Sequence, residues 1–216
     1  GSIGSTSPAR KYYLAEGTTG YGFTTYLLIQ NPNPDRVDVT LIYMTEGGPV
    51  VQPSFTLPPL SRKTVRVNDQ LPDRDFSTHV SASRPILAER AMYWNRGFAE
   101  ACHDSIGLDS PHTAFYFPDG ETANGHETWT LVGNPGPSDV RVEVSYMTPT
   151  GEGGRTFTDN IPAGSRRTYN MALQLPDGRA AVMVRCLTPG TRIIAERAMY
   201  WESRYAGTCT IGAHSD

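Results

Sequence analysis

Apolar and polar residues alternate with a period of two along several segments of this 216-residue chain. In residues 37–44, Val37, Val39, Leu41 and Tyr43 alternate with Asp38, Thr40, Ile42 and Met44, and residues 140–147 repeat the pattern. A period of two with one apolar face is typical of a half-buried antiparallel strand. Both segments are therefore predicted to be strands of an antiparallel sheet.

Other segments rich in β-branched and aromatic residues predict the remaining strands. They are residues 24–30, 55–57, 64–67, 80–83 and 86–94, with counterparts at 128–132, 157–161 and 167–170. Asn31-Pro32 and Asn134-Pro135 are expected to end a strand and begin a turn. No segment has a persuasive helical stripe, although 67–71 and 171–175 each predict one short helical turn. The fold class is therefore predicted as all-β.

A seven-residue string occurs twice, as Ala-Glu-Arg-Ala-Met-Tyr-Trp at 88–94 and again at 195–201. Weaker matches at similar offsets run along the whole chain and define a unit of about 100 residues, the usual size of a self-sufficient domain. We predict two tandem domains at 11–109 and 110–216, preceded by a linker or tag remnant at 1–10. About seven short strands per unit favour an immunoglobulin-like antiparallel β-sandwich for each.

Several motifs resemble a repeat module of large secreted or surface-attached bacterial proteins. They are Ala15-Glu16-Gly17-Thr18-Thr19-Gly20, the segment 26–33, the repeated heptapeptide, and His103-Asp104-Ser105-Ile106-Gly107. The sequence is also similar to bacterial adhesion-related immunoglobulin-like domains. The resemblance implies an extracellular or cell-surface β-sandwich within a multi-domain protein, and it carries no catalytic residues over to this chain.

Charge and hydropathy narrow the expected partners. The net charge is −3 and no basic patch stands out, which disfavours nucleic-acid binding. No run of 18 apolar residues is present, so membrane insertion is not expected. The expected partners are other domains of the parent protein, a second copy of the chain, or glycans, and no cofactor is expected.

The repeated heptapeptide contains adjacent charges, Glu89-Arg90 and Glu196-Arg197. On a strand, neighbouring residues point to opposite faces, so each charge needs a partner elsewhere. Glu16 and Asp119 are candidate partners for the arginines. We interpret the four residues as members of structural ion pairs; the alternative is a general acid or a ligand-binding arginine.

His103 and Asp104 are the candidate metal ligands, because imidazole and carboxylate both bind transition metals. Their spacing fits no recognised zinc pattern, and the second copy has Thr208-Cys209 at this place. A structural turn is the favoured interpretation, and no metal site is predicted.

Three cysteines leave at least one thiol unpaired. A bridge between Cys186 and Cys209 is the favoured pairing. Three free thiols, or a bridge between Cys102 and Cys209, are the alternatives. The pairing stays open on the sequence alone.

Three aromatic residues, Tyr21, Phe23 and Trp129, are candidates for ligand-facing rings that stack on sugars, and the seam between the copies is the favoured place for such a site. The main hypothesis is a non-catalytic structural, spacer or adhesion module that self-associates or joins other domains. A carbohydrate-binding accessory domain of a secreted hydrolase is the alternative. An enzyme is not expected, because neither a catalytic triad nor a metal constellation is apparent in both copies.

Overall fold

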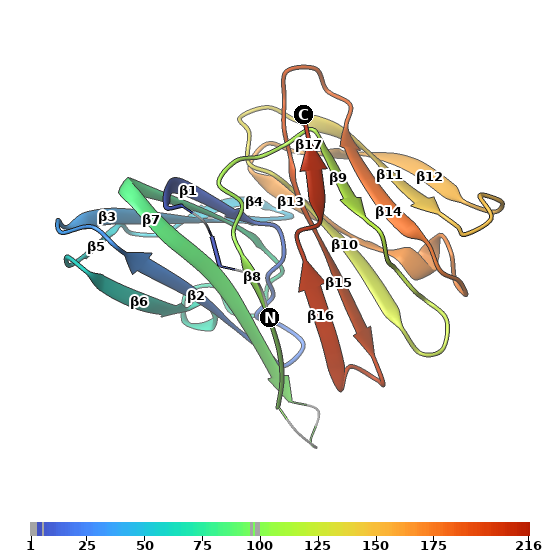
Figure 1. The fold of residues 1–216 in the computed structure, drawn as a ribbon, viewed down its shortest axis with the longest axis horizontal. Coiled ribbons are helices and arrows are strands. Elements are labelled where there is room, and N and C mark those ends of the chain that lie inside the picture. The colour runs from blue at the N-terminus through green and yellow to red at the C-terminus, as the bar shows by residue number, and fades with distance from the viewer. Residues whose placement is uncertain (1–3, 6, 96, 98–99) are drawn as a thin grey trace.

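The computed structural model describes residues 4–5, 7–95, 97 and 100–216, and antiparallel strands make up most of it (Figure 1). In the N-terminal half the strands are β1 (Ala9–Leu14), β2 (Phe23–Asn31), β3 (Val37–Thr45), β4 (Gly48–Val51), β5 (Phe55–Leu57), β6 (Ser61–Arg66), β7 (Ser77–Asn95) and β8 (Glu100–Ile106). In the C-terminal half they are β9 (Ala114–Phe117), β10 (Glu127–Asn134), β11 (Val140–Met147), β12 (Arg155–Ile161), β13 (Ser165–Asn170), β14 (Ala181–Cys186), β15 (Ile194–Trp201), β16 (Ala206–Thr210) and β17 (Ala213–Ser215). The all-β prediction is confirmed.

The long strand β7 organises the N-terminal half because it belongs to both layers of the sandwich. Its first part pairs with β1 and β3, and its last part pairs with β2 and β8. The strands β4 and β5 extend the first layer from β3, and β6 extends the second from β2. The apolar faces of the two layers enclose a core that includes Leu27, Val39, Leu41 and Phe76, all fully buried or nearly so.

The C-terminal half has the same pattern of pairing in two separate sheets. One has the order β13-β10-β15-β16 and the other β12-β11-β14-β9-β17. The counterpart of β7 is interrupted here, since β14 ends at Cys186 and β15 begins at Ile194, with a Pro-Gly turn between them. Val132, Val142, Val144 and Phe115 lie in the core of this half.

Two local predictions are also borne out. Each predicted helical turn is present as a short 3-10 helix, at Val67–Asp69 and at Met171–Leu173. The residues of β3 alternate between buried and more exposed positions along most of the strand, as a half-buried strand should.

The prediction of separate strands at 80–83 and 86–94 is wrong, because β7 is continuous through Pro85. Its pairing with β3 ends at Ala82 and its pairing with β2 begins at Leu87. Pro85 therefore lies where the strand crosses between layers, next to the irregularity in the pairing of β7 with β1 between Ala9 and Lys11. In addition, β1 begins at Ala9, so the last two residues of the predicted linker belong to the sandwich.

The two halves lie side by side and meet along β8 and β16 (Figure 1). The strands β1 and β15 also approach one another across this seam. Within the described part of the chain, no helix has the length and apolar character needed to cross a membrane.

Candidate functional site at the seam between the halves

An apolar cluster lies in the seam between the N-terminal and C-terminal halves. Its members are Phe23, Met92 and Trp94 from the first half and Leu131, Ala198 and Tyr200 from the second. The indole of Trp94 also donates a hydrogen bond to the carbonyl of Arg204 at 2.6 Å. The seam is therefore packed in the same way as a protein core.

The two halves use opposite faces of the same heptapeptide. The positions that enter the seam are Arg90, Met92 and Trp94 from β7, and Glu196, Ala198 and Tyr200 from β15. These are the Arg, Met and Trp of the motif in one half and its Glu, Ala and Tyr in the other. The contact is therefore head to tail, since a two-fold axis would place the same residues on both sides.

Arg90 lies at the centre of a buried ionic network that joins the halves. Its Nη1 is 2.8 Å from Glu196 Oε2, and its Nη2 is 3.2 Å from Glu16 Oε2. The same Nη1 donates to the carbonyl of Glu16 at 3.0 Å. Glu196 Oε1 also accepts the backbone N–H of Ala15 at 2.8 Å. One guanidinium thus binds a carboxylate from each half.

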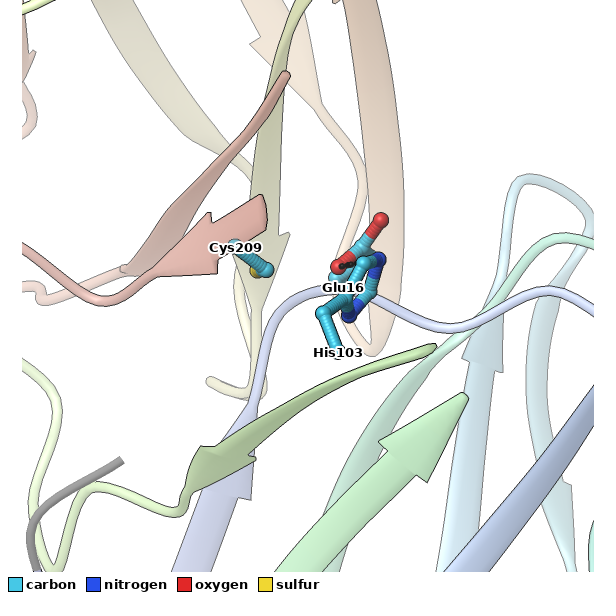
Figure 2. A group of neighbouring side chains, drawn as sticks. All are labelled: Glu16, His103 and Cys209. Carbon is cyan, nitrogen blue, oxygen red and sulfur yellow. Dashed lines mark ion pairs between the residues drawn. The ribbon is translucent and has the colours of Figure 1, made fainter. Parts of the chain in front are cut away.

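Glu16, His103 and Cys209 converge in the seam (Figure 2), and Glu16 joins this group to Arg90. His103 Nε2 lies 3.1 Å from the hydroxyl of Tyr200, and that hydroxyl donates to Glu16 Oε1 at 3.0 Å. The thiol of Cys209 donates to Glu196 Oε2 at 3.0 Å. The network therefore contains groups from both halves; Glu16, Arg90, Glu196, His103 and Tyr200 are buried, and Cys209 is half-buried.

Burial and neighbouring charges set the protonation states of the network. Burial opposes the charge on Arg90, but the carboxylates of Glu196 and Glu16 raise its pKa well above the usual value. Burial, followed by repulsion from Glu16 and Glu196, raises the pKa of Cys209 well above normal, so its thiol stays protonated.

Glu16 and His103 influence each other. Burial lowers the pKa of His103 despite the nearby Glu16, so this imidazole is neutral at pH 7. Burial would raise the pKa of Glu16, but the positive charges of His103, when protonated, and of Arg90 lower it overall. With His103 neutral, Arg90 is the charge that keeps Glu16 ionised.

Glu16, His103 and Cys209 each offer a ligand atom, and these atoms lie within 4.8 Å of one another. A transition metal would need Glu16 Oε2, which already faces Arg90, and a thiolate from Cys209, which the local charge disfavours. The arrangement therefore fits an ion-pair network better than a metal centre.

His103 and Asp104, the candidate metal ligands, point to opposite faces of β8. His103 pairs in register with Met92 and points into the seam, while Asp104 pairs with Ala91 on the opposite face of β8. Glu16 and Cys209 accompany His103 instead. Cys209 was missed as a neighbour of His103 because the two lie in different halves of the chain.

The four residues interpreted as structural ion pairs have different environments. Arg90 and Glu196 pair with each other across the seam, and Arg197 lies 3.7 Å from Asp119 within its own half. Glu89 has no ion pair within the described residues and lies on the outer face of β7. Burial and then repulsion from Asp104 raise its pKa.

The predicted disulfide between Cys186 and Cys209 is absent, and Cys102, Cys186 and Cys209 are free thiols. Cys186 lies on β14 and Cys209 on β16, which belong to different sheets. The thiol of Cys186 contacts the hydroxyl of Thr191 at 3.1 Å. The period-two pattern around Cys186 could not reveal which sheet Cys209 joins.

A cleft of ≈ 220 Å³ opens at the edge of the seam and brings together Tyr21, Phe23 and Trp129. Tyr21 is 66% exposed, whereas Phe23 is buried against Trp94 and Tyr200. Phe23, one of the candidate ligand-facing rings, therefore lines the cleft but has almost no exposed ring surface for stacking on a sugar. Phe23 is the first residue of β2 and follows the Gly-rich turn, and its ring points inward from the strand.

No family model matches this sequence, and no curated protein matches it. Among solved structures, Thermotoga maritima 1070 is similar at 16% identity and a TM-score of 0.45, over 48% of this chain and 96% of that one. The Anabaena sensory rhodopsin transducer is similar at 23% identity and a TM-score of 0.34, over 41% of this chain and 99% of that one. The PBSX exported protein XepA has 7% identity and a TM-score of 0.28, over 91% and 84% of the respective chains. Structural similarities with TM-scores below 0.5 do not indicate a shared function.

The seam network predicts a large effect for Arg90→Met. This change leaves Glu16 and Glu196 buried without their cation, so we expect the free energy of unfolding to fall by about 3–5 kcal/mol. Arg185→Met, which breaks the more exposed pair with Glu143, should cost at most about 1 kcal/mol. Urea denaturation followed by circular dichroism measures both. Equal losses in the two variants would contradict a special role for the seam network.

The lowered pKa of His103 predicts a specific pH dependence. Below its unfolded value near 6.5 the unfolded chain binds a proton that the folded chain does not, so stability falls as the pH drops from 7 toward 5. Glu16, Arg90, Glu196 and Asp104 are the charged groups that act on this imidazole.

His103→Gln should make the loss of stability between pH 7 and pH 5 shallower. His126→Gln, which removes a histidine at a partly exposed position outside the seam, is the matched control. Denaturation curves at half-unit pH steps measure the slopes. An unchanged slope in His103→Gln would show that the imidazole titrates normally.

Proposed function

We propose that this chain is a non-catalytic structural module, immunoglobulin-like in architecture, of a larger secreted or cell-surface bacterial protein. It serves as a spacer or adhesion element. The observation that carries the proposal is the burial of Arg90 between Glu16 and Glu196, which come from different halves. Such a contact favours one fixed arrangement of the halves, as a spacer requires.

The accessibility of the charged groups supports a mechanical role over catalysis. Arg90, Glu16, Glu196 and His103 are each at most 4% exposed. A substrate would have to displace these partners from one another, and separating a buried ion pair is costly. The polar groups of the seam therefore serve contact between the halves.

The extracellular assignment rests on the sequence motifs. The heptapeptide, the Ala15-Glu16-Gly17 segment and the His103-Asp104 segment resemble a repeat module of bacterial surface proteins. Glu16, His103 and part of the heptapeptide lie at the seam. We infer that the motif set encodes the packing of one unit on the next.

A rigid seam predicts that both halves tumble as one body. Backbone residual dipolar couplings from both halves should fit a single alignment tensor in the parent chain. In Arg90→Met the halves should need two different tensors, because the central cation is lost, whereas Arg185→Met should still fit one. A parent chain that already requires two tensors would overturn the spacer proposal.

The cleft at the edge of the seam supports a second candidate function, the binding of a saccharide. Tyr21 and Trp129 offer aromatic surface there, and Arg204, which is paired with Glu127, adds hydrogen-bond donors beside the rings. A volume of ≈ 220 Å³ suits a ligand of about one sugar ring. The cleft is the site that we propose for the carbohydrate-binding alternative.

Saccharide binding at the cleft predicts a signal on a glycan array that depends on Tyr21. Tyr21→Ala should abolish the signal, since this exposed ring is available for stacking and its loss leaves the buried seam intact. Tyr116→Ala, which removes another exposed tyrosine outside the cleft, is the matched control and should bind as the parent does. A blank array, or a signal that survives Tyr21→Ala, removes the cleft as a sugar site.

A further inference from the structure

We propose that the seam is also the pattern for contact between two copies of this chain, packed head to tail. The outer face of the N-terminal half is the side of β7 that carries Glu89, Ala91 and Tyr93. The free end of the C-terminal half is the surface that carries Tyr116, Met147 and Thr208. The outer face of one copy would bind the free end of a neighbouring copy. This deepens the proposed structural function by naming the partner, a second copy of the chain. The argument follows from the head-to-tail character of the internal contact, which leaves one complementary surface open on each half.

The outer face of the N-terminal half is the counterpart of the surface that the C-terminal half buries in the seam. Glu89, Ala91 and Tyr93 correspond to Glu196, Ala198 and Tyr200 of the repeated heptapeptide. By register, Tyr26 opposite Ala91 corresponds to Trp129 opposite Ala198. In this chain the outer face carries a hollow of ≈ 500 Å³ lined in part by Tyr26, Ala91 and Tyr93. The surface is thus present, with Ala91 buried beneath the half-buried rings of Tyr26 and Tyr93.

The free end of the C-terminal half is the counterpart of the surface that the N-terminal half buries. Tyr13 and Met44 are 7% and 2% exposed in the seam, while their counterparts Tyr116 and Met147 are 39% and 44% exposed. Thr208, at the position of His103, is also exposed. An exposed Tyr and Met at positions that are buried in the other half indicate an unused contact surface.

The residues that correspond to the seam ion pair of Arg90 and Glu196 are Arg197 and Glu89, which lie in different halves and do not contact each other. Arg197 Nη1 donates to the carbonyl of Asp119 at 2.9 Å, just as Arg90 Nη1 donates to the carbonyl of Glu16. Arg90 has a second acceptor, Glu196, and within the described residues Arg197 has no such second carboxylate. Glu89 is the residue that corresponds to Glu196, and it lies half-buried on the outer face, in a hollow that Gly4, Ser5 and Ile106 also line.

Docking one chain on the next would therefore bring Glu89 of one copy to Arg197 of its neighbour. The side chain of Asp119 is 70% exposed, so the approach to Arg197 is bordered by a solvated carboxylate. The contact would repeat from each copy to the next, since every copy has both an outer face and a free end. A heterologous contact of this kind builds open arrays or rings.

Two substitutions weaken this contact relative to the seam. Pro118 stands at the position of Ala15, whose N–H binds Glu196 in the seam, and proline has no N–H to give. Asp104 stands at the position of Cys209 and places a second carboxylate beside Glu89. The association is therefore reversible and depends on concentration, unlike the internal seam.

Sedimentation velocity of the full chain from about 10 µM to about 1 mM tests the proposal, since weak contacts become populated in this range. The weight-average sedimentation coefficient should rise with concentration. Glu89→Arg places a cation against Arg197 and should leave the chain monomeric over this concentration range, a loss of affinity well above tenfold. Glu152→Arg makes the same charge change at an exposed turn of the C-terminal half and should leave the association within about twofold of the parent value.

A mixing experiment tests the head-to-tail geometry. Glu89→Arg disables the outer face, and Thr208→Trp blocks the free end, so each variant alone should be monomeric. Mixed in equal amounts they should form a dimer and nothing larger, because each retains the surface that the other needs. A two-fold symmetric contact could not be restored in this way.

A chain that stays monomeric up to about 1 mM overturns the proposal, as does association that is unaffected by Glu89→Arg. Failure of the mixture to form a dimer, with both single variants monomeric, overturns the head-to-tail geometry. A single alignment tensor in a non-associating chain would leave the spacer role intact, so the two proposals fail separately. Circular dichroism spectra of the variants that match the parent spectrum establish that both remain folded.

Discussion

The guanidinium of Arg90 is the group on which the arrangement of the two halves depends. A charge that is fully buried must be compensated within hydrogen-bond distance, because no solvent is available to do it. Here one carboxylate comes from the N-terminal half and the other from the C-terminal half. Any rotation of one half against the other would separate Arg90 from Glu196, so apolar packing alone does not set the orientation of the seam.

The same constraint explains why two identical heptapeptides have different surroundings. A strand presents alternate residues to opposite sides, so a motif with Arg, Met and Trp on one side and Glu, Ala and Tyr on the other carries both members of a complementary contact. When one copy packs on the next, the cationic side of the first meets the acidic side of the second. This contact forms the ion pair between Arg90 and Glu196. Glu89 and Arg197, the other two charged residues of the heptapeptides, lie outside the seam.

Local patterns predicted much of the fold but little of the seam. The period of two located β3 and β11, and the same alternation placed adjacent Glu and Arg on opposite faces of their strand. It could not give long-range information: the passage of β7 through Pro85 between layers, the inward turn of Phe23, or the position of Cys209 beside Glu196. Each of these depends on which strands become neighbours in space, which alternation along one strand does not encode.

The differences between the two halves follow their different roles at the seam. Where the N-terminal half meets its neighbour, it has Ala15 with an N–H to donate and His103 to contact Tyr200, whereas the C-terminal half has Pro118 and Thr208 at these places. On the acidic side the seam position is Cys209, whose protonated thiol donates to Glu196, and its counterpart on the outer face is Asp104. A carboxylate in place of Cys209 would add a third negative charge beside Glu16 and Glu196, with Arg90 alone to offset it. The seam therefore requires a neutral donor there, and the open face has no such requirement.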